Sequence, residues 1–448
     1  MADDRERDRA FRAERRRQQR RLTAIQRDTA GEVARILREA ETRISARLAG
    51  PASEFQAFLL PEARNAVRAA LGTFERDGGA AVQQGVGRAW LAGVDMLDRP
   101  VEAGLAAGGG PQVRLSAILP SIDTRQLEAM KTFLTGRMRD VTVKLADRIN
   151  AELGLVLAGA QGPGEAASAI SQILRSGGAQ GGRRRVITIV RTELGRAHAA
   201  AGQARYSQAA TVLPGLKKQW RRSGKIHARI DHVAADGQVR EVDEPYRVGG
   251  VALMYPRDPD APAAATVNCG CSSLPYMEHW DMRQPGRQPF SRQEVALSPA
   301  KRALEQALDA VPVPPAATSP ELAALLAGRR AAPVPVARLP GGLAQAIGAR
   351  TATVSVSRPT VVKQAKHREV TQAAYGQVQA MIDRGEAIRD RNGDLVLVTR
   401  DAGGRLWEAA IKRTGEGGEL FLTSLHRSRE QRRRSLRRRG EILRVEEQ

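Results

Sequence analysis

The chain has few cysteines and few aromatic residues. Its 448 residues include only two cysteines, which excludes a disulfide framework, and aromatic residues make up 4% of the chain. No apolar run reaches the roughly 20 residues that a membrane-spanning helix needs. The first 21 residues are charged throughout and lack an apolar signal core. We therefore expect a protein that contacts no membrane and is assembled in a reducing cytoplasm.

Acidic residues are too few to balance the basic ones. The 71 Lys and Arg residues against 49 Asp and Glu residues give a net charge of +22, and this excess points to a polyanionic partner, most simply nucleic acid. The charge is densest in residues 427–439, which hold eight arginines and one glutamate. Such a run is either a solvated helix face or a phosphate-binding surface. The candidate nucleic-acid contacts are Arg427, Arg432, Arg433, Arg434, Arg437, Arg438 and Arg439.

Apolar residues recur at helical spacing through the first 210 residues. Steps of three and four residues indicate amphipathic helices with one face turned to a core. A glycine-rich stretch at residues 104–111 interrupts this pattern. The helices are expected over residues 22–48, 53–74, 82–97, 123–153, 165–174 and 184–210.

Beyond residue 214 the pattern changes to short strands, a linker and a separate module. Strands are expected at residues 216–222, 239–242 and 251–255. Residues 284–359 are rich in Pro and Ala, which predicts a semi-rigid linker with short helices. The last module should contain a helix at 368–384, strands at 395–399, 406–412 and 419–424, and a basic helix that starts at His426.

Taken together, these patterns predict an α+β multidomain protein. We expect a helical N-terminal half, a small mixed α/β core that ends in a Cys-x-Cys turn, a Pro/Ala linker, and a C-terminal helix plus antiparallel meander. The expected domains are residues 1–120, 121–282, 283–360 and 361–448.

The two cysteines, Cys269 and Cys271, stand one residue apart. On an extended segment both thiols point to one side, and two thiolates with the imidazole of His232 suit zinc. His227 or Asp236 would complete such a ligand set, although Cys-x-Cys is tighter than the usual zinc-finger spacing. The alternatives are two reduced thiols buried beside a turn, or a strained bridge between them.

Polar residues before the cysteines are predicted to hold the core together. Arg191 and Glu193 are two positions apart on a helix, so they cannot pair on one face, and each is expected to find a partner outside the helix. A structural ion pair is favoured over a hydrolytic site built from Glu193, His232 and Asp236. The predicted structural residues are Arg191, Glu193, Trp220, Arg229 and Asp236.

Six landmarks in a fixed order resemble a known family. They are residues 190–193, Trp220, 229–232, 236–237, 256–259 and 268–271. In this series the chain is similar to the Mu F-like phage head-morphogenesis proteins, the minor capsid proteins of tailed phages, over about residues 120–280. Val190 stands where the family commonly has Ala, and Gly270 stands where it commonly has Arg, which removes a charge.

This resemblance implies a virion component that is present in few copies at the portal vertex and acts in head assembly. The implied partners are the portal protein, other capsid components and phage DNA, and the implied location is the phage head, assembled in the bacterial host cytoplasm from a phage or prophage gene. The core is not expected to be an enzyme. The alternative is a stand-alone nucleic-acid-binding protein unrelated to capsids.

Residues 366–439 resemble the small ribonuclease-like domains grouped with barnase, colicin and RelE toxins. The similarity rests on the leading helix, the strand at 404–412 and the Leu-Thr-Ser-Leu-His sequence at 422–426. It implies a metal-independent ribonuclease, a toxin delivered to the host, that acts on RNA; a small binding domain is the alternative. His426 is the candidate acid or base, Lys412 the candidate phosphate-holding cation, and Thr423 and Ser424 the candidate phosphate hydrogen-bond donors.

Overall fold

The computed structural model describes residues 2–48, 60–110, 112–175, 182–278, 280, 286–330, 332–414 and 418–445. The chain divides into two compact units. One unit consists of residues 9–212 and 242–275, and the other consists of residues 1–8, 213–241 and 276–448. Each unit has its own hydrophobic core.

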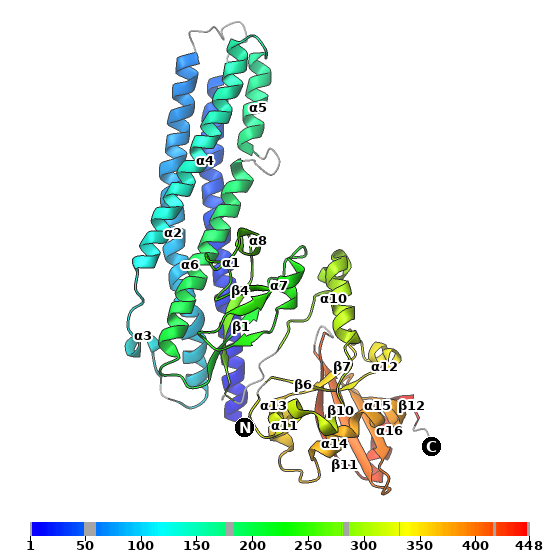
Figure 1. Cartoon of the computed structure of the whole chain (residues 1–448). Coiled ribbons are helices and arrows are strands. Elements are labelled where there is room, and N and C mark those ends of the chain that lie inside the picture. The colour runs from blue at the N-terminus through cyan, green and yellow to red at the C-terminus, as the bar shows by residue number, and fades with distance from the viewer. Residues whose placement is uncertain are drawn as a thin grey trace. The chain divides into compact units, whose positions relative to one another are not determined.

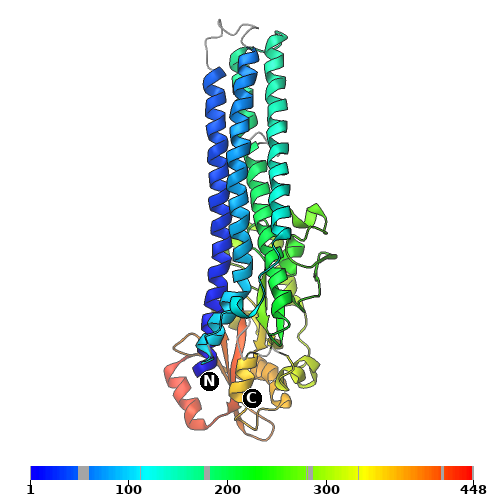
Figure 2. The same cartoon turned by 90° about the vertical axis from the view of Figure 1, so that its left-hand side faces the viewer.

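Long helices that lie side by side build the N-terminal half (Figure 1, Figure 2). Their apolar stripes meet in one core, where Val33, Phe74, Val86 and Ile149 are fully buried. The helices are α1 (Ala2–Leu48), α2 (Leu60–Ala107), α3 (Leu115–Ile118), α4 (Arg125–Leu157), α5 (Pro163–Arg175) and α6 (Gly182–Ala209). The predicted helical N-terminal half is confirmed.

A single helix, α2, replaces the two helices predicted between residues 53 and 97, of which residues 53–59 lie outside the described residues. It continues through Gly78 and Gly79, each of which costs a helix about 1 kcal/mol relative to alanine. A Cβ atom on Gly78 would lie 3.4 Å from both Phe74 and Met138, so the glycine fits a closely packed helix surface. Tertiary packing of α2 therefore overrides the local preference for a break.

Short strands and helices follow α6, as the change of pattern predicted. Strands β2, β1 and β5 form a three-stranded sheet in that order, and β3 pairs with β4 in an antiparallel hairpin. The elements are β1 (Leu216–Arg221), α7 (Ile230–Ala234), β2 (Val239–Arg240), β3 (Tyr246–Val248), β4 (Val251–Leu253), α8 (Ala263–Thr266) and β5 (Ser272–Met277). Because β5 starts directly after Cys271, the Cys-x-Cys segment lies at the turn that leads into this strand.

The Pro/Ala-rich segment contains ordered elements along most of its length. The side chains of Ser298 and Ser319 cap two helices that each begin with proline, a residue whose fixed backbone suits a first helical position. The elements are α9 (Arg292–Leu297), α10 (Pro299–Ala310), the 3₁₀ helix η4 (Ala316–Thr318), α11 (Pro320–Leu326), α12 (Gly341–Ala346) and α13 (Arg358–Gln364), with strands β6 (Val334–Arg338) and β7 (Thr353–Val356).

A seven-stranded sheet forms the C-terminal part, in the order β12-β8-β9-β10-β11-β7-β6. Its central strands are the predicted antiparallel meander, whereas β7 runs parallel to β11. The remaining strands are β8 (Glu386–Arg389), β9 (Leu395–Arg400), β10 (Leu406–Arg413), β11 (Leu420–Arg427) and β12 (Glu441–Arg444). The structure thus differs from the predicted linker, because residues 334–356 contribute two strands to this sheet.

Helices cover both faces of the seven-stranded sheet. The predicted helix over residues 368–384 is two shorter helices, α14 (Gln372–Gly376) and α15 (Val378–Arg384), which pack on the main core. On the other face α16 (Glu430–Arg439) buries Leu436 against Val396, Val398 and Leu406. His426 lies inside β11, whereas the sequence pattern had placed it at the start of the basic helix.

Among the helices in the described ranges, none is long and apolar enough to pass through a membrane.

Candidate functional site

Strand alternation gathers polar side chains on one face of the C-terminal sheet. In β10, Glu408, Ala410 and Lys412 are two residues apart and therefore point to the same face. The register pairs Glu408 with His426 and Ala410 with Ser424 on the neighbouring strand β11. The pairing shifts between Ala410 and the next residue, and such an irregularity locally changes the direction in which side chains point.

This face contains a pocket of about 450 Å³. Charged and hydroxyl side chains dominate its lining, so it suits a polar, charged ligand better than an apolar one. The lining residues are Lys363, Asp390, Asp394, Val396, Glu408, Ala410, Lys412, Thr423, Ser424, His426 and Arg432. All four predicted catalytic residues, His426, Lys412, Thr423 and Ser424, thus line one pocket.

Two of these four residues already have partners inside the fold. The Lys412 ammonium lies 2.6 Å from an Asp394 carboxylate oxygen, although the lysine side chain remains half exposed. The Thr423 hydroxyl donates a hydrogen bond of 3.2 Å to the Ala410 carbonyl oxygen. Lys412 therefore offers a cation at the pocket rim, whereas the hydroxyl hydrogen of Thr423 is used within the sheet.

His426 is half-buried in the pocket and stacks on His367, with ring centroids 5.8 Å apart and an angle of 27° between the rings. Burial lowers the pKa of His426 below its ordinary value, and His367 and Arg432 lower it further. Glu408 and Glu369 oppose this by raising the pKa. The Nδ1 atom of His367 lies 3.4 Å from a Glu369 carboxylate oxygen. A lowered pKa keeps His426 neutral at pH 7, the form that accepts a proton.

Glu408 is a pocket residue that the sequence analysis missed. Its side chain is 4% exposed. The Ser428 hydroxyl donates a hydrogen bond of 2.9 Å to Glu408 Oε2, and Arg432 lies 3.2 Å from Oε1. The missed signal is the alternation of Leu406, Glu408, Ala410 and Lys412, which places an acid and a base on one strand face.

The basic helix α16 uses several of its arginines to hold buried carboxylates. Arg432 pairs with Glu408, and both Arg433 and Arg437 pair with Glu386, whose side chain is fully buried. Arg427 lies over the Trp407 ring at 5.9 Å. The other predicted contacts are exposed and form no ion pair with any residue that the structure describes; they are Arg434, Arg438 and Arg439.

In the unit of residues 9–212 and 242–275, which we call the helical unit, three of the six sequence landmarks meet at a contact between α6 and the turn before β5, which we call the clasp. The Asn268 backbone N–H donates a hydrogen bond of 2.9 Å to the Thr192 hydroxyl. Arg257, which is 2% exposed, donates to the Cys269 carbonyl at 2.7 Å and to the Gly195 carbonyl at 3.0 Å. Its guanidinium lies directly on α6, since a Cβ atom at Gly195 would be 2.4 Å from Arg257 Cζ.

Glu193 finds its partner within its own helix, so the predicted partner outside the helix is wrong for this residue. Arg196 Nη1 lies 2.6 Å from Glu193 Oε2, three positions along α6. Burial raises the pKa of Glu193, and the positive charges of Arg196, Arg137 and Arg257 oppose the rise. Arg191, also predicted as a structural residue, is exposed on the same helix.

The remaining predicted structural residues lie around β1 and α7. Trp220 is fully buried and donates its ring N–H to the His232 carbonyl at 3.1 Å. Asp236 is also buried; it accepts hydrogen bonds from the Arg221 guanidinium at 3.0 Å and from the Arg222 backbone N–H at 2.9 Å. Arg229 is exposed, directly before the first residue of α7. These bonds engage the Asp236 carboxylate, which therefore acts as a structural group.

The two cysteines and His232 form a buried group that is able to hold a metal ion. One imidazole nitrogen and the two sulfur atoms all lie within 4.8 Å of one another. Both cysteines are free thiols, which removes the predicted alternative of a bridge between them. The other two ligand candidates do not join this group. His227 is exposed, and the Asp236 carboxylate accepts hydrogen bonds from Arg221 of β1 and from the backbone N–H of Arg222.

Comparisons with known proteins add little to this picture. No family model matches the chain, and no solved structure matches it. NAD(+)--arginine ADP-ribosyltransferase EFV of Enterococcus faecalis is 30% identical to this chain over 95 residues. The match covers 21% of this chain and 19% of that protein, so the chain spans about a fifth of the length of this curated relative. A similarity over so small a part of the chain does not assign the chain to a family or to an activity.

Proposed function

We propose that this chain is a minor head protein of a tailed phage, and that its C-terminal sheet carries a metal-independent ribonuclease. The observation that carries the nuclease is the pocket in which His426, Lys412 and Ser424 lie beside the buried Glu408. The head-protein assignment rests on the order of the six sequence landmarks and is supported by the clasp at Thr192 and Arg257.

RNA cleavage through its own 2′-hydroxyl needs a base, an acid and positive charge around the phosphate. Neutral His426 takes the proton of the 2′-hydroxyl while that oxygen bonds to phosphorus. The bond from phosphorus to the 5′-oxygen breaks, and His367, stacked on His426, gives a proton to the leaving oxygen. The products are a 2′,3′-cyclic phosphate and a free 5′-hydroxyl, and one proton is removed for each one delivered.

The other pocket residues bind and orient the phosphate. The ammonium groups of Lys412 and Lys363 supply positive charge, and the Ser424 hydroxyl is placed to donate to a non-bridging oxygen. Glu408 raises the pKa of His426 and so limits the lowering that burial causes. It also holds Arg432 at the pocket wall.

Full-length protein incubated with RNA tests the nuclease. We expect cleavage that ends in cyclic phosphates, and we expect His426→Ala to slow it by about 10²- to 10⁴-fold, the usual contribution of a positioned acid or base. RNA affinity of this variant should be unchanged. Intact RNA at every pH and divalent-ion concentration would contradict the proposal. A protein that binds RNA without cleaving it, and loses affinity when Arg434 and Arg438 are neutralised, is instead a binding module.

Purified phage particles test the head-protein assignment. We expect the protein in the particles at few copies, and antibody labelling at a single vertex. The net charge of +22 supports a role beside packaged DNA, where positive segments neutralise phosphates. Absence from the particles would contradict the assignment and favour a stand-alone nucleic-acid-binding protein.

We also propose that the group of His232, Cys269 and Cys271 holds zinc. Thiolate and imidazole ligands are the set that zinc prefers, and all three of these residues are buried. Metal analysis should give about one zinc per chain, and zinc should be lost in Cys269→Ser. The exposed His227, changed to Asn, is the matched control and should keep the metal. Metal-free protein whose melting is unchanged by Cys269→Ser rules zinc out.

A further inference from the structure

Two adjoining pockets lie between α4 and α6, and Arg185 lines both of them. Their volumes are about 270 and 420 Å³. We call them together the α4–α6 groove. Its basic lining residues are Arg137, Lys144, Arg148, Arg184 and Arg185.

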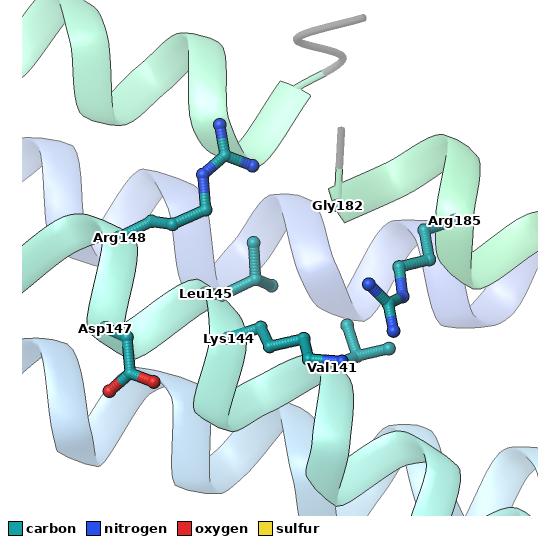
Figure 3. A pocket seen from close by; sticks show the side chains of 7 residues that line it. All are labelled: Val141, Lys144, Leu145, Asp147, Arg148, Gly182 and Arg185. Carbon is teal, nitrogen blue, oxygen red and sulfur yellow. The ribbon is translucent and has the colours of Figure 1, made fainter. Parts of the chain in front are cut away.

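Helical spacing explains why these cations form a line. Arg137, Lys144 and Arg148 stand seven and then four positions apart on α4, so they share one face of the helix. The eleven helical steps from Arg137 to Arg148 span about 17 Å at a rise of 1.5 Å each. Figure 3 shows Lys144 and Arg185 reaching toward each other from α4 and α6, with Arg148 on the other side of Leu145.

Carboxylates near the groove neutralise only part of its charge. Asp140 is shared by two cations, at 3.0 Å from Lys144 and 2.8 Å from Arg185. Glu193 is already paired with Arg196 at 2.6 Å, and Asp147 points away from the two arginines of its pocket (Figure 3). Arg137 and Arg184 are exposed and form no ion pair within the described part of the chain. The groove therefore keeps a positive potential.

The floor of the groove is closed by apolar side chains. Val141, Leu145 and Ile189 are at most 6% exposed there. Gly182 approaches so closely that a Cβ atom on it would lie 3.0 Å from Leu145. A shallow floor with charged rims does not bury a small apolar molecule, but it fits an extended, highly charged chain that stays partly in water.

We propose that the α4–α6 groove binds the phosphate backbone of DNA. The proposal rests on the head-protein function and names the surface through which that protein touches packaged DNA. Its length of about 17 Å corresponds to about five nucleotide steps of one B-form strand at 3.4 Å each. Four of its five cations are arginines, whose planar fork of donors matches phosphate oxygens.

The salt dependence of DNA binding by full-length protein tests the groove. The variant Arg137→Gln/Arg184→Gln removes the two cations without ion pairs, and binding of a short fluorescent duplex is followed by anisotropy between about 50 and 200 mM salt. Each lost phosphate contact reduces the slope of log affinity against log salt by about 0.9, so we expect a change of about 1.8. Thermal melting should stay the same, because both side chains are exposed.

The matched control is Arg64→Gln/Arg68→Gln, which removes the same charge from exposed positions of α2 outside both pockets. Its slope should equal that of the unchanged protein. The groove is ruled out as the DNA-binding surface if Arg137→Gln/Arg184→Gln keeps the original salt slope. It is also ruled out if the salt slope of the control variant falls by the same amount. It is also ruled out if polyglutamate binding depends on Arg137 and Arg184 while DNA binding does not, since the partner is then an acidic protein.

The two proposals fail in different ways. A protein absent from phage particles overturns the head-protein function but leaves a measured DNA groove standing. RNA cleavage by the C-terminal pocket should be unchanged in the Arg137→Gln/Arg184→Gln variant, so a loss of DNA affinity with normal cleavage locates the effect in the helical unit.

Discussion

Glu408 and His426 face each other on neighbouring strands, and this pairing gives the pocket a testable pH dependence. Burial lowers the pKa of His426 and Glu408 raises it, so Glu408→Gln should lower that pKa further. A base with a lower pKa stays neutral to lower pH, and the acid limb of the kcat/KM profile for RNA cleavage should move to lower pH. Arg432→Gln removes a lowering influence and should move the limb upward. If the acid limb moved in the same direction in Glu408→Gln and in Arg432→Gln, these two residues would not set the pKa of His426 in the way described.

Gly195 has a specific reason to be glycine, because Arg257 lies against α6 at that position. A Cβ atom there would be 2.4 Å from Arg257 Cζ, so Gly195→Ala should displace a buried guanidinium and lose its hydrogen bonds. We expect a loss of about 2 kcal/mol or more in the free energy of unfolding, measured with urea.

The control for Gly195→Ala is Gly136→Ala in the middle of α4. Nothing lies within 4 Å of a Cβ atom at Gly136, and the position is exposed. Alanine should therefore stabilise the protein by about 0.5–1 kcal/mol, since it restricts the unfolded chain. If both variants change stability equally, close packing at Gly195 is not the reason for its glycine.

From the sequence one could predict which residue types line the C-terminal pocket, but not the secondary structure around them or their burial. His426, Lys412, Thr423 and Ser424 line one pocket even though His426 had been placed at the start of a helix. The alternation in β10 puts Glu408 on the same face as Lys412, but it does not show that the carboxylate is buried. Its burial is possible only because Ser428 and Arg432 approach from a later segment, a contact that sequence spacing does not reveal.

At the scale of elements, α16 is held by charge pairs as well as by Leu436. Arg433 and Arg437 both pair with Glu386, whose side chain is fully buried. Changing both arginines to Gln leaves a buried carboxylate without its partners, so we expect a loss of about 3 kcal/mol or more in the free energy of unfolding. Denaturant titration of the full chain measures it.

The paired control in α16 is Arg434→Gln/Arg438→Gln. These exposed arginines have no ion pair in the described residues, so stability should change by less than about 0.5 kcal/mol while nucleic-acid affinity falls. The opposite ranking, with stability lost in this control variant, would mean that the ion pairs of Arg433 and Arg437 with Glu386 do not hold the helix.

Proline explains why strand β6 was mistaken for linker. Pro335 lacks a backbone N–H, and proline within a short apolar run argues against a central strand. In the sheet order β6 is an edge strand. A proline there can point its nitrogen away from the neighbouring strand, so that no hydrogen bond between strands is lost. The helices predicted at residues 53–74 and 82–97 are likewise one helix over the described residues, because packing of α2 outweighs the local cost of Gly78 and Gly79. Helices with long apolar stripes could be predicted without knowledge of tertiary contacts. For α4 the observed bounds, Arg125–Leu157, lie close to the predicted residues 123–153.

At the scale of the whole molecule, the core places the boundary of the C-terminal part earlier than composition does. The main hydrophobic cluster of the seven-stranded sheet runs from Ala316 to Leu425, and 12 of its 26 buried residues precede residue 361. β7 lies between β11 and β6, with Val354 opposite Leu420. A fragment that starts at residue 361 therefore lacks nearly half of this core and leaves one side of β11 without its neighbouring strand.

Two fragments should consequently behave differently. Residues 311–448 retain every residue of the cluster and should unfold cooperatively on heating, with the near-ultraviolet circular dichroism of packed aromatic side chains. Residues 361–448 should show weak cooperativity and associate, because the exposed edge of β11 and the uncovered apolar face favour pairing with other chains. Equal melting midpoints for the two fragments would mean that residues 334–356 add no stability, and the Pro/Ala-rich segment would then be a spacer after all.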